Sequence, residues 1–203
     1  MPQRVTLIRH AEAQPMAENR PLSYGREAPL SALGCWQAKC LSGPLAGLGK
    51  ILVYASPLAR AAETARIATE PLGIGFEVDS CLCEIDFGQW EGLSFEEMAG
   101  RDPDRVKDWE RFAPDFAFPG GERLGDFVDR VGDVARRVIA LQRPVTLISH
   151  GGVIRTLICL FLGLDPRHYL LFGADCASIS QIDLFGERGV LVRLNDTCHL
   201  DDH

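Results

Sequence analysis

The chain has 203 residues, of which 46% are hydrophobic, so it is long enough and apolar enough for one globular domain with a substantial core. Its formal net charge of −7 argues against a nucleic-acid-binding surface, and no apolar run approaches the roughly 18 residues that a membrane-spanning helix needs. The seven cysteines show the spacing of neither a zinc site nor a redox pair, which favours reduced thiols in the cytoplasm. The first residues lead directly into an apolar strand, so we expect no signal peptide.

Six segments rich in apolar and β-branched residues predict strands, and helices are expected in most of the intervals between them. The strands are expected over residues 5–8, 51–55, 75–78, 145–149, 178–185 and 190–194. The helices are expected over residues 32–45, 58–71, 124–141 and 152–162. Ser31 is the expected N-cap of the first helix, and Asp165 followed by Pro166 predicts one further helix start.

The alternation of strands and helices predicts an α/β fold with three layers, α/β/α, around a mostly parallel central sheet. One stretch, residues 84–123, breaks this alternation and is rich in aromatic residues, prolines and glycines. We interpret it as a helical insertion that lies over the active site at the sheet edge and forms part of its wall. Because no linker or internal repeat divides the chain, residues 1–203 are expected to form a single domain.

Two of the predicted strands are followed by a histidine. Residues 5–8 lead into Arg9 and His10, and residues 145–149 lead into His150. In open α/β sheets ligands bind just beyond the carboxyl ends of the strands, so both imidazoles can reach one crevice. An arginine is costly to bury unpaired, and its planar fork suits phosphate oxygens. Two imidazoles and one guanidinium therefore predict an anion site that suits a phosphoryl group.

Three further residues add to this prediction. Arg60 is expected in the first turn of the helix after strand 51–55, where a helix N-terminus favours anions. A surface arginine paired with Glu63 is the alternative. Gly151 and Gly152 let the backbone approach a ligand closely and open a helix with free N–H groups. Since the chain as a whole is acidic, an anion site must be a local cluster of positive groups.

A general acid is expected in the segment that begins the insertion. Three carboxylates, those of Glu84, Asp86 and Glu91, lie there among apolar residues. One of them could donate a proton to a leaving group. Composition does not choose among the three.

Together these segments resemble the histidine phosphatase superfamily, in the branch that includes cofactor-dependent phosphoglycerate mutases and small phosphomonoesterases. Arg9-His10-Ala11 stands in the place of the family's Arg-His-Gly. The family's Ser-Pro-Leu-x-Arg-Ala-x-x-Thr-Ala, Glu-Ile-x-Phe-Gly-x-Trp-Glu-Gly and His-Gly-Gly motifs match Ser56 to Ala65, Glu84 to Gly92 and His150 to Gly152. The matches come in the family's order and cover nearly the whole chain.

The resemblance implies a role for each of five residues. His10 would be the nucleophile that attacks phosphorus and forms a phosphohistidine. Arg9, Arg60 and His150 would hold the phosphoryl oxygens, because phosphoryl transfer depends on positioning and on neutralising oxygen charge. Glu84 would protonate the leaving alkoxide and then activate water. The resemblance implies no metal and no other cofactor.

Further contacts with substrate are expected from residues around the crevice. Gly151 would contribute through its backbone, Arg20 and Tyr24 lie in the loop after the first strand, and Arg123 follows the insertion. Arg155, in the helix after the second histidine, is expected to be structural.

The chain departs from the family pattern at three positions. Ala11 replaces a glycine whose carbonyl normally orients the nucleophilic imidazole, and alanine is expected to keep that carbonyl. Met16 stands where many relatives have an asparagine that contacts the phosphoryl group, so one donor is expected to be missing. Arg123 stands where a serine is common, which changes either a substrate contact or a solvent-exposed position.

The resemblance implies a metal-independent phosphomonoesterase that acts on a small phosphorylated metabolite. The stretch between Glu84 and the following long helix is shorter than in mutases. Residues 84–92 and 118–122 are similar to those of α-ribazole phosphatases, which suggests α-ribazole 5′-phosphate as a substrate. A cofactor-dependent phosphoglycerate mutase and a non-catalytic phospho-ligand binding module are the alternatives. The sequence leaves open whether the protein is a monomer or a homodimer.

Overall fold

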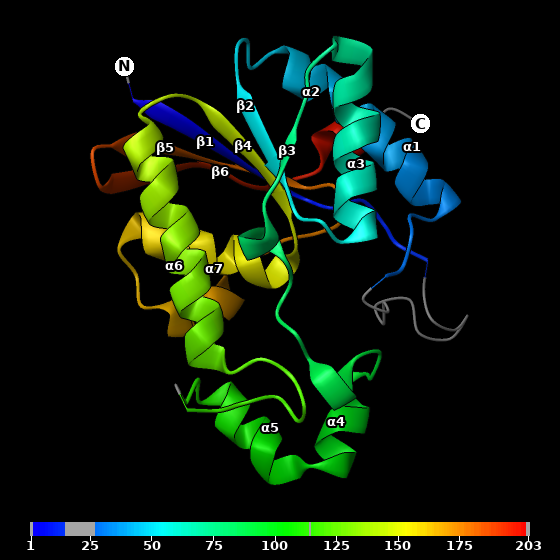
Figure 1. Ribbon diagram of the computed structural model, residues 1–203, viewed down its shortest axis with the longest axis vertical. Helices are drawn as coiled ribbons and strands as arrows, with labels where there is room; N and C mark the ends of the chain where they lie inside the picture. Colours follow the sequence, from blue (N-terminus) through cyan, green and yellow to red (C-terminus); the bar gives the residue numbers. More distant parts are fainter. Residues whose placement is uncertain (1, 15–26, 114, 202–203) are drawn as a thin grey trace.

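The computed structural model describes residues 2–14, 27–113 and 115–201 and contains a six-stranded sheet with helices on both faces (Figure 1). The strands lie in the order β3-β2-β4-β1-β5-β6. They are β1 (Gln3–Arg9), β2 (Leu52–Ala55), β3 (Glu77–Val78), β4 (Val145–Ser149), β5 (Ile179–Phe185) and β6 (Arg188–Asp196). Strands β1 to β4 are parallel, whereas β5 and β6 are antiparallel to their neighbours. The predicted mostly parallel α/β sheet is therefore confirmed.

The helices agree with the sequence prediction except near residue 41. They are α1 (Ala32–Cys40), α2 (Ser42–Ala46), α3 (Ala59–Thr69), α4 (Phe95–Arg101), α5 (Pro103–Glu110), α6 (Leu124–Leu141) and α7 (Gly151–Leu162). The single helix expected over residues 32–45 is wrong, because the chain breaks at Leu41 into α1 and α2. Pro44 has no N–H to donate to the carbonyl of Cys40, so a continuous helix would lose a hydrogen bond there. No helix in the described ranges is both long and apolar enough to cross a bilayer.

Short 3₁₀ helices complete the fold. They cover Glu70–Leu72, Ser80–Leu82, Gly88–Trp90, Pro166–Leu171 and Cys198–Leu200. Asp165 caps the fourth of these as expected, since its carboxylate accepts a hydrogen bond from the main-chain N–H of Arg167.

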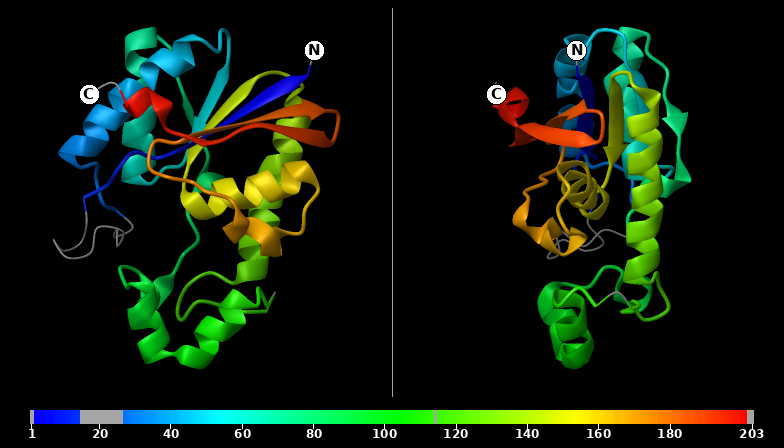
Figure 2. Two further views of the ribbon diagram at one scale, coloured as in Figure 1. Left: turned by 180° about the vertical axis from the view of Figure 1, so that it is seen from behind. Right: turned by 90° about the vertical axis from the view of Figure 1, so that its left-hand side faces the viewer.

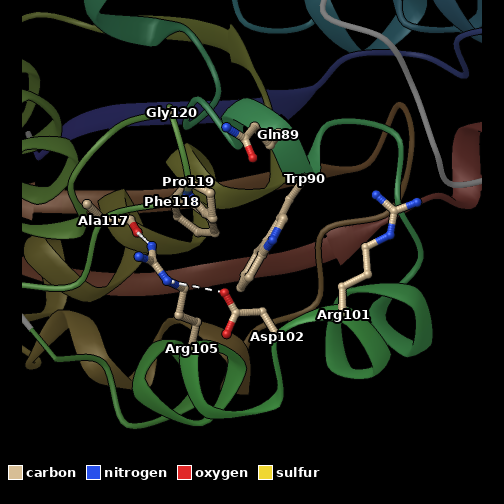
Figure 3. A pocket seen from close by; sticks show the side chains of 9 residues that line it. All are labelled: Gln89, Trp90, Arg101, Asp102, Arg105, Ala117, Phe118, Pro119 and Gly120. Carbon is tan, nitrogen blue, oxygen red and sulfur yellow. Dashed lines mark hydrogen bonds and ion pairs between the residues drawn. The ribbon is translucent and has the colours of Figure 1, made fainter.

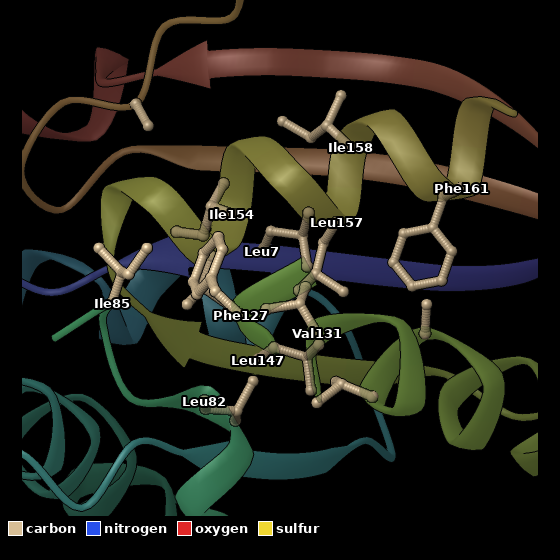
Figure 4. Close-up of a cluster of buried hydrophobic side chains, with 14 of the residues drawn as sticks. Leu7, Leu82, Ile85, Phe127, Val131, Leu147, Ile154, Leu157, Ile158 and Phe161 are labelled. Atoms are coloured by element: carbon tan, nitrogen blue, oxygen red, sulfur yellow. The ribbon is translucent and has the colours of Figure 1, made fainter. Parts of the chain in front are cut away.

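Alternation along the central strands divides the core into two layers. Leu7 and Leu147 face α6 and α7, where Phe127 packs against them (Figure 4). Ile8 and Ile148, one residue further on, face α1, α2 and α3. Each of these side chains is almost fully buried, which stabilises the fold by about 1.5–3 kcal/mol per side chain. Figure 2 shows the sheet edge-on between the two helical layers.

The insertion, residues 84–123, forms a lobe that carries α4 and α5 beyond the end of the sheet (Figures 1 and 2). Its core is aromatic: the ring of Phe118 lies 4.9 Å from that of Phe116 and 5.7 Å from that of Trp90, in edge-to-face contacts. The two ends of the insertion touch through backbone, because a Cβ at Gly121 would lie 2.2 Å from the carbonyl oxygen of Asp86. This close approach needs glycine and ties the segment after Glu84 to the far end of the lobe.

Candidate active site

The site begins where β1 and β4 end side by side. The two strands pair with Arg9 opposite Ser149, so the next residues, His10 and His150, leave the sheet at the same edge. The main-chain N–H of His10 donates to the carbonyl of Ser149 (2.8 Å), and the two imidazole centroids lie 5.1 Å apart. Both histidines are buried. The structure thus brings together two imidazoles that are 140 residues apart in sequence.

His10 is held in one tautomer. Its Nδ1 lies 2.8 Å from the carbonyl oxygen of Ala11, which can only accept, so Nδ1 carries the proton and Nε2 keeps its lone pair. Alanine therefore keeps the orienting carbonyl, as expected. Burial, together with the charges of Arg9 and Arg60, lowers the pKa of His10 well below 6.5. The imidazole is consequently neutral at neutral pH, which is the form that a nucleophile needs.

Two arginines lie beside this imidazole. Arg60, in the first turn of α3, is nearly buried, and its Nε–H points to His10 Nε2 at 3.3 Å. Glu63, the alternative partner considered for Arg60, accepts a hydrogen bond from the main-chain N–H of Leu30. Arg9 donates through Nη1 to the carbonyl of Ala174 (2.6 Å), while its buried Nε has no hydrogen-bond partner among the described residues. A buried donor without an acceptor indicates a ligand atom in the working site.

His150 carries a second unpartnered atom. Its Nε2 lies 2.8 Å from the hydroxyl oxygen of Ser56, and its buried Nδ1 has no partner. Ser56 Oγ accepts a hydrogen bond from the main-chain N–H of Leu58 (3.2 Å), so its own proton is available to Nε2. Burial and the neighbouring charges of His10, Arg60 and Arg9 lower the pKa of His150 well below 6.5. With Nε2 accepting from the serine, Nδ1 carries the proton and can donate to an anion.

The structure separates the three candidate acids. Glu84 lines the pocket at the site, where its Oε2 accepts from the main-chain N–H of Gly152 (3.1 Å) at the start of α7. Asp86 accepts from Gly88 N–H, and Glu91 accepts from Phe87 N–H, within their own loop. A Cβ at Gly152 would lie 2.5 Å from Glu84 Oε1, so the glycine makes room for this carboxylate. Glu84 is therefore the carboxylate at the pocket.

The comparison of the chain with known protein families agrees with this geometry. Residues 5–197 match the model of the histidine phosphatase superfamily, branch 1. The chain belongs to the histidine phosphatase superfamily. It is 32% identical to phosphoserine phosphatase 1 of Hydrogenobacter thermophilus, over 98% of this chain and 95% of that protein. It is 29% identical to a probable phosphoglycerate mutase of Salmonella paratyphi C, over 97% and 94%.

Solved structures of the family show the same fold. The alpha-ribazole phosphatase from Shigella flexneri superposes with a TM-score of 0.82 at 28% identity, over 96% of each chain. With its phosphatase relatives, the chain is an enzyme of the phosphate-ester hydrolase class.

The pocket of this histidine phosphatase has a volume of about 230 Å³. It is lined by Arg9, Glu84, Ile85, Phe87, Trp109, Leu124, Phe127, Gly151, Gly152, Arg155, Tyr169 and Leu170. Phe87 and Trp109 come from residues 84–123, so the insertion contributes part of the wall, as expected. In the part of the chain that the structure describes, no group of three or more His, Cys, Asp or Glu side chains is placed to hold a metal ion.

The structure leaves three predicted substrate contacts untested. Arg123 precedes α6 with its guanidinium partly exposed, and it donates to Asp126 (2.7 Å) and Asp115 (3.5 Å). It is not among the described residues that line the pocket, so its contact with substrate stays a prediction. Arg20 and Tyr24, like Met16, lie outside the described residues.

Sequence reasoning missed the residues that hold the functional groups in place. Ser56 and Thr64 belong to a recognised motif, yet their hydrogen bonds to His150 and to the N–H of Ala11 became evident only in the fold. Arg130 in α6 donates to the carbonyls of Cys81 and Cys83 and pairs with Glu122 (2.8 Å). It thereby ties the segment that ends at Glu84 to α6. From the sequence, Arg130 is recognisable only as a residue on the polar face of an amphipathic helix. The sequence therefore gave no sign that it holds the segment before Glu84.

A second, larger cavity of about 640 Å³ lies within the insertion (Figure 3). It is lined by Gln89, Trp90, Arg101, Asp102, Arg105, Ala117, Phe118, Pro119 and Gly120. It shares none of these residues with the pocket at Glu84. Arg105 pairs with Asp102 (3.2 Å) and also approaches the carbonyl of Ala117 (3.4 Å).

Proposed function

We propose that this histidine phosphatase is a metal-independent phosphomonoesterase that acts through a phosphohistidine on a small phosphorylated metabolite. The observation that carries the proposal is the state of His10. It is a neutral, buried imidazole whose Nε2 lone pair is free of a proton and faces the Arg60 guanidinium. Two buried donors without a partner, Arg9 Nε and His150 Nδ1, add to the anion-binding character of the site.

The proposed first step is transfer of the phosphoryl group to His10. Nε2 attacks phosphorus, a P–N bond forms, and the bond to the ester oxygen breaks. Glu84 gives its proton to the leaving oxygen, a contribution of about 10²–10⁴ in rate for a positioned general acid. Arg9, Arg60 and His150 donate to the phosphoryl oxygens, whose charge they neutralise in place of a metal ion.

The second step returns the enzyme to its starting state. The Glu84 carboxylate accepts a proton from a water molecule as that water attacks phosphorus. The P–N bond breaks, inorganic phosphate leaves, and Glu84 is protonated again for the next cycle. Splitting one difficult displacement into two easier ones is the advantage of covalent catalysis.

Two narrower activities have an observation in their favour. α-Ribazole 5′-phosphate carries an aromatic base, which suits the aromatic wall of Phe87, Trp109 and Tyr169, and one structural relative is an alpha-ribazole phosphatase. Phosphoglycerate mutation is the other, because one relative is a probable phosphoglycerate mutase. The seven free cysteines support a cytoplasmic setting for either activity.

A trapping experiment tests the proposal. The protein is mixed rapidly with radiolabelled p-nitrophenyl phosphate in the presence of EDTA and quenched in alkali. We expect a burst of p-nitrophenol and a base-stable, acid-labile phosphoenzyme, which is lost in His10→Ala and kept in His168→Ala, a change at an exposed position. Hydrolysis that EDTA abolishes, or a label that survives in His10→Ala, would overturn the proposal. Transfer of the label to phosphoglycerate rather than to water would favour the mutase.

A further inference from the structure

Arg155 lies in the active-site pocket, and its guanidinium has more donors than it uses in hydrogen bonds with the described residues. It stands one helical turn after Gly151 on α7 and is partly buried. Its Nε donates to the carbonyl of Phe172 (2.9 Å), which fixes the plane of the guanidinium. In the described part of the chain neither Nη atom takes part in a hydrogen bond or an ion pair. The guanidinium is therefore oriented by Phe172, and its two Nη atoms can donate to a ligand.

The charges around Arg155 leave the pocket with an excess of positive charge. A Cβ placed on Gly151 would lie 3.8 Å from Arg9 Nε and 3.9 Å from Arg155 Nη1, so both guanidiniums flank this glycine. The carboxylate nearest to them in the pocket, that of Glu84, binds the N–H groups of Gly152 and Ile85 and forms no ion pair with either arginine. Burial and the charge of Arg9 lower the pKa of Arg155, while the charges of Glu84 and Asp175 act in the opposite direction without reversing the shift.

The position of Arg155 points to the leaving group rather than to the phosphoryl group. The side chain of Arg155 reaches back along α7, because its Nη1 would lie 3.9 Å from a Cβ on Gly151, in the first turn of that helix. Glu84, which would protonate the leaving oxygen, stands over the first turn of the same helix. An anion held by Arg155 therefore belongs to the part of the substrate beyond the ester oxygen.

We propose that Arg155 forms an anion subsite for the leaving group, so that this enzyme prefers phosphate monoesters with a carboxylate a few bonds from the ester oxygen. The proposal rests on the phosphatase function above. A guanidinium held flat by Phe172 offers two Nη donors in the geometry that a carboxylate accepts.

The aromatic wall makes this subsite selective. Trp109 and Tyr169 also line the pocket, and hydrogen bonds in less polar surroundings of this kind are stronger than in water, which favours the pairing of Arg155 with a carboxylate. An uncharged leaving group would leave the donors of Arg155 unpaired, and sites built around a charged partner reject such ligands strongly. The subsite thus ranks carboxylate-bearing esters above α-ribazole 5′-phosphate.

Pairs of substrates that differ by one carboxylate test the proposal. O-Phosphoserine is compared with O-phosphoethanolamine, and 3-phosphoglycerate with glycerol 3-phosphate. For the wild-type enzyme we expect kcat/KM to be at least about tenfold higher for the carboxylate-bearing member of each pair. In Arg155→Met the ratio should fall to within about threefold of unity, and Arg155→Lys should keep an intermediate ratio.

Controls separate this proposal from the proposed function. Arg167→Met removes an exposed arginine that pairs with Asp165 (2.9 Å) and should leave the ratio unchanged. A wild-type enzyme that hydrolyses p-nitrophenyl phosphate through His10 but treats both members of each pair alike overturns the subsite alone. An unchanged ratio in Arg155→Met does the same. If the enzyme hydrolyses none of these esters, the phosphatase proposal itself fails.

Discussion

The pocket at Glu84 and the cavity within the insertion both contain arginines, but the arginines have different partners in the two places. In the active-site pocket Arg9 and Arg155 donate to main-chain carbonyls, and neither forms an ion pair with a carboxylate of the described residues. In the insertion cavity Arg105 pairs with Asp102, and Arg101 is exposed to solvent (Figure 3). The larger cavity is therefore already neutralised or solvated, whereas the smaller one needs an anion from outside.

This difference shows which positive charges indicate function in an acidic protein. An exposed ion pair such as Arg105 with Asp102 contributes about 0–1 kcal/mol and needs no ligand to explain it. A partly buried guanidinium without a counter-ion raises the free energy of the folded state until an anion binds. Cavity size alone would select the insertion cavity, whereas the bonding of the arginines favours the pocket at Glu84.

Replacing one acidic residue in each pocket is expected to give the largest difference in enzyme activity between the two variants. Glu84→Gln removes the proposed proton donor, so we expect kcat for an alkyl phosphate to fall by about 10²–10⁴. The loss should be much smaller for p-nitrophenyl phosphate, whose leaving group needs little protonation. Asp102→Asn, the matched change in the insertion cavity, should leave both rates within about twofold. Equal losses on both substrates in Glu84→Gln would contradict the role of this residue as an acid.

Replacing one arginine in each pocket should give the next largest difference in kcat/KM between the two variants. Arg9→Met removes a donor aimed at the phosphoryl group, and we expect kcat/KM to fall by roughly 10²–10³, the usual loss for one such donor. Arg105→Met removes only a partly exposed ion pair and should change kcat/KM little. Steady-state kinetics on purified, folded variants measure both. A comparable loss in Arg105→Met would mean that the insertion cavity takes part in binding.

The sequence predicted the parts of the site that follow from strand order. Parallel strands end at one edge, so His10 and His150 could be placed together without coordinates. Composition could not choose Glu84 over Asp86, and only the family resemblance selected it, because the choice depends on which carboxylate reaches the N–H of Gly152 across the fold.

The same limit explains the other misses. The break between α1 and α2 came from one missing N–H at Pro44, a local cause that the apolar pattern hid. The excess charge at Arg155 is a property of its neighbours in space, since Arg9 is close to it only in the folded chain. Periodicity predicts which face of α7 is buried, but it does not predict which guanidinium lacks a carboxylate partner.

Two glycine-to-alanine substitutions test whether the Glu84 carboxylate needs the space that Gly152 leaves for it. The added methyl group in Gly152→Ala would lie 2.5 Å from Glu84 Oε1, so the flexible carboxylate must move away. A displacement of this size costs about tenfold to a hundredfold in kcat for an alkyl phosphate. Gly100→Ala in α4, where a Cβ meets nothing within 4 Å, is the control and should keep full activity. Full activity in Gly152→Ala would show that the carboxylate need not sit over α7.

The smallest expected effect is a dependence of the stability of the folded state on pH, caused by the two buried histidines of the active site. Burial lowers the pKa values of His10 and His150 below those of the unfolded chain, so the unfolded state binds protons more readily near pH 6. The stability of the folded state is thus fully present above about pH 6.5 and falls as the pH drops toward the folded pKa values, by up to about 1.4 kcal/mol per pH unit for each histidine.

Thermal unfolding at pH 7.5 and pH 5.0 measures this effect as a difference in Tm. A loss of 1 kcal/mol lowers Tm by roughly 2–4 °C in a protein of this size. The drop in Tm on acidification should shrink in His10→Gln and in His150→Gln and stay unchanged in His168→Gln, at an exposed position. Because the comparison uses the change in Tm with pH, any uniform destabilisation by a variant cancels. An undiminished drop in both active-site variants would mean that carboxylates elsewhere control the acid sensitivity, and that the buried imidazoles are not held neutral by the fold.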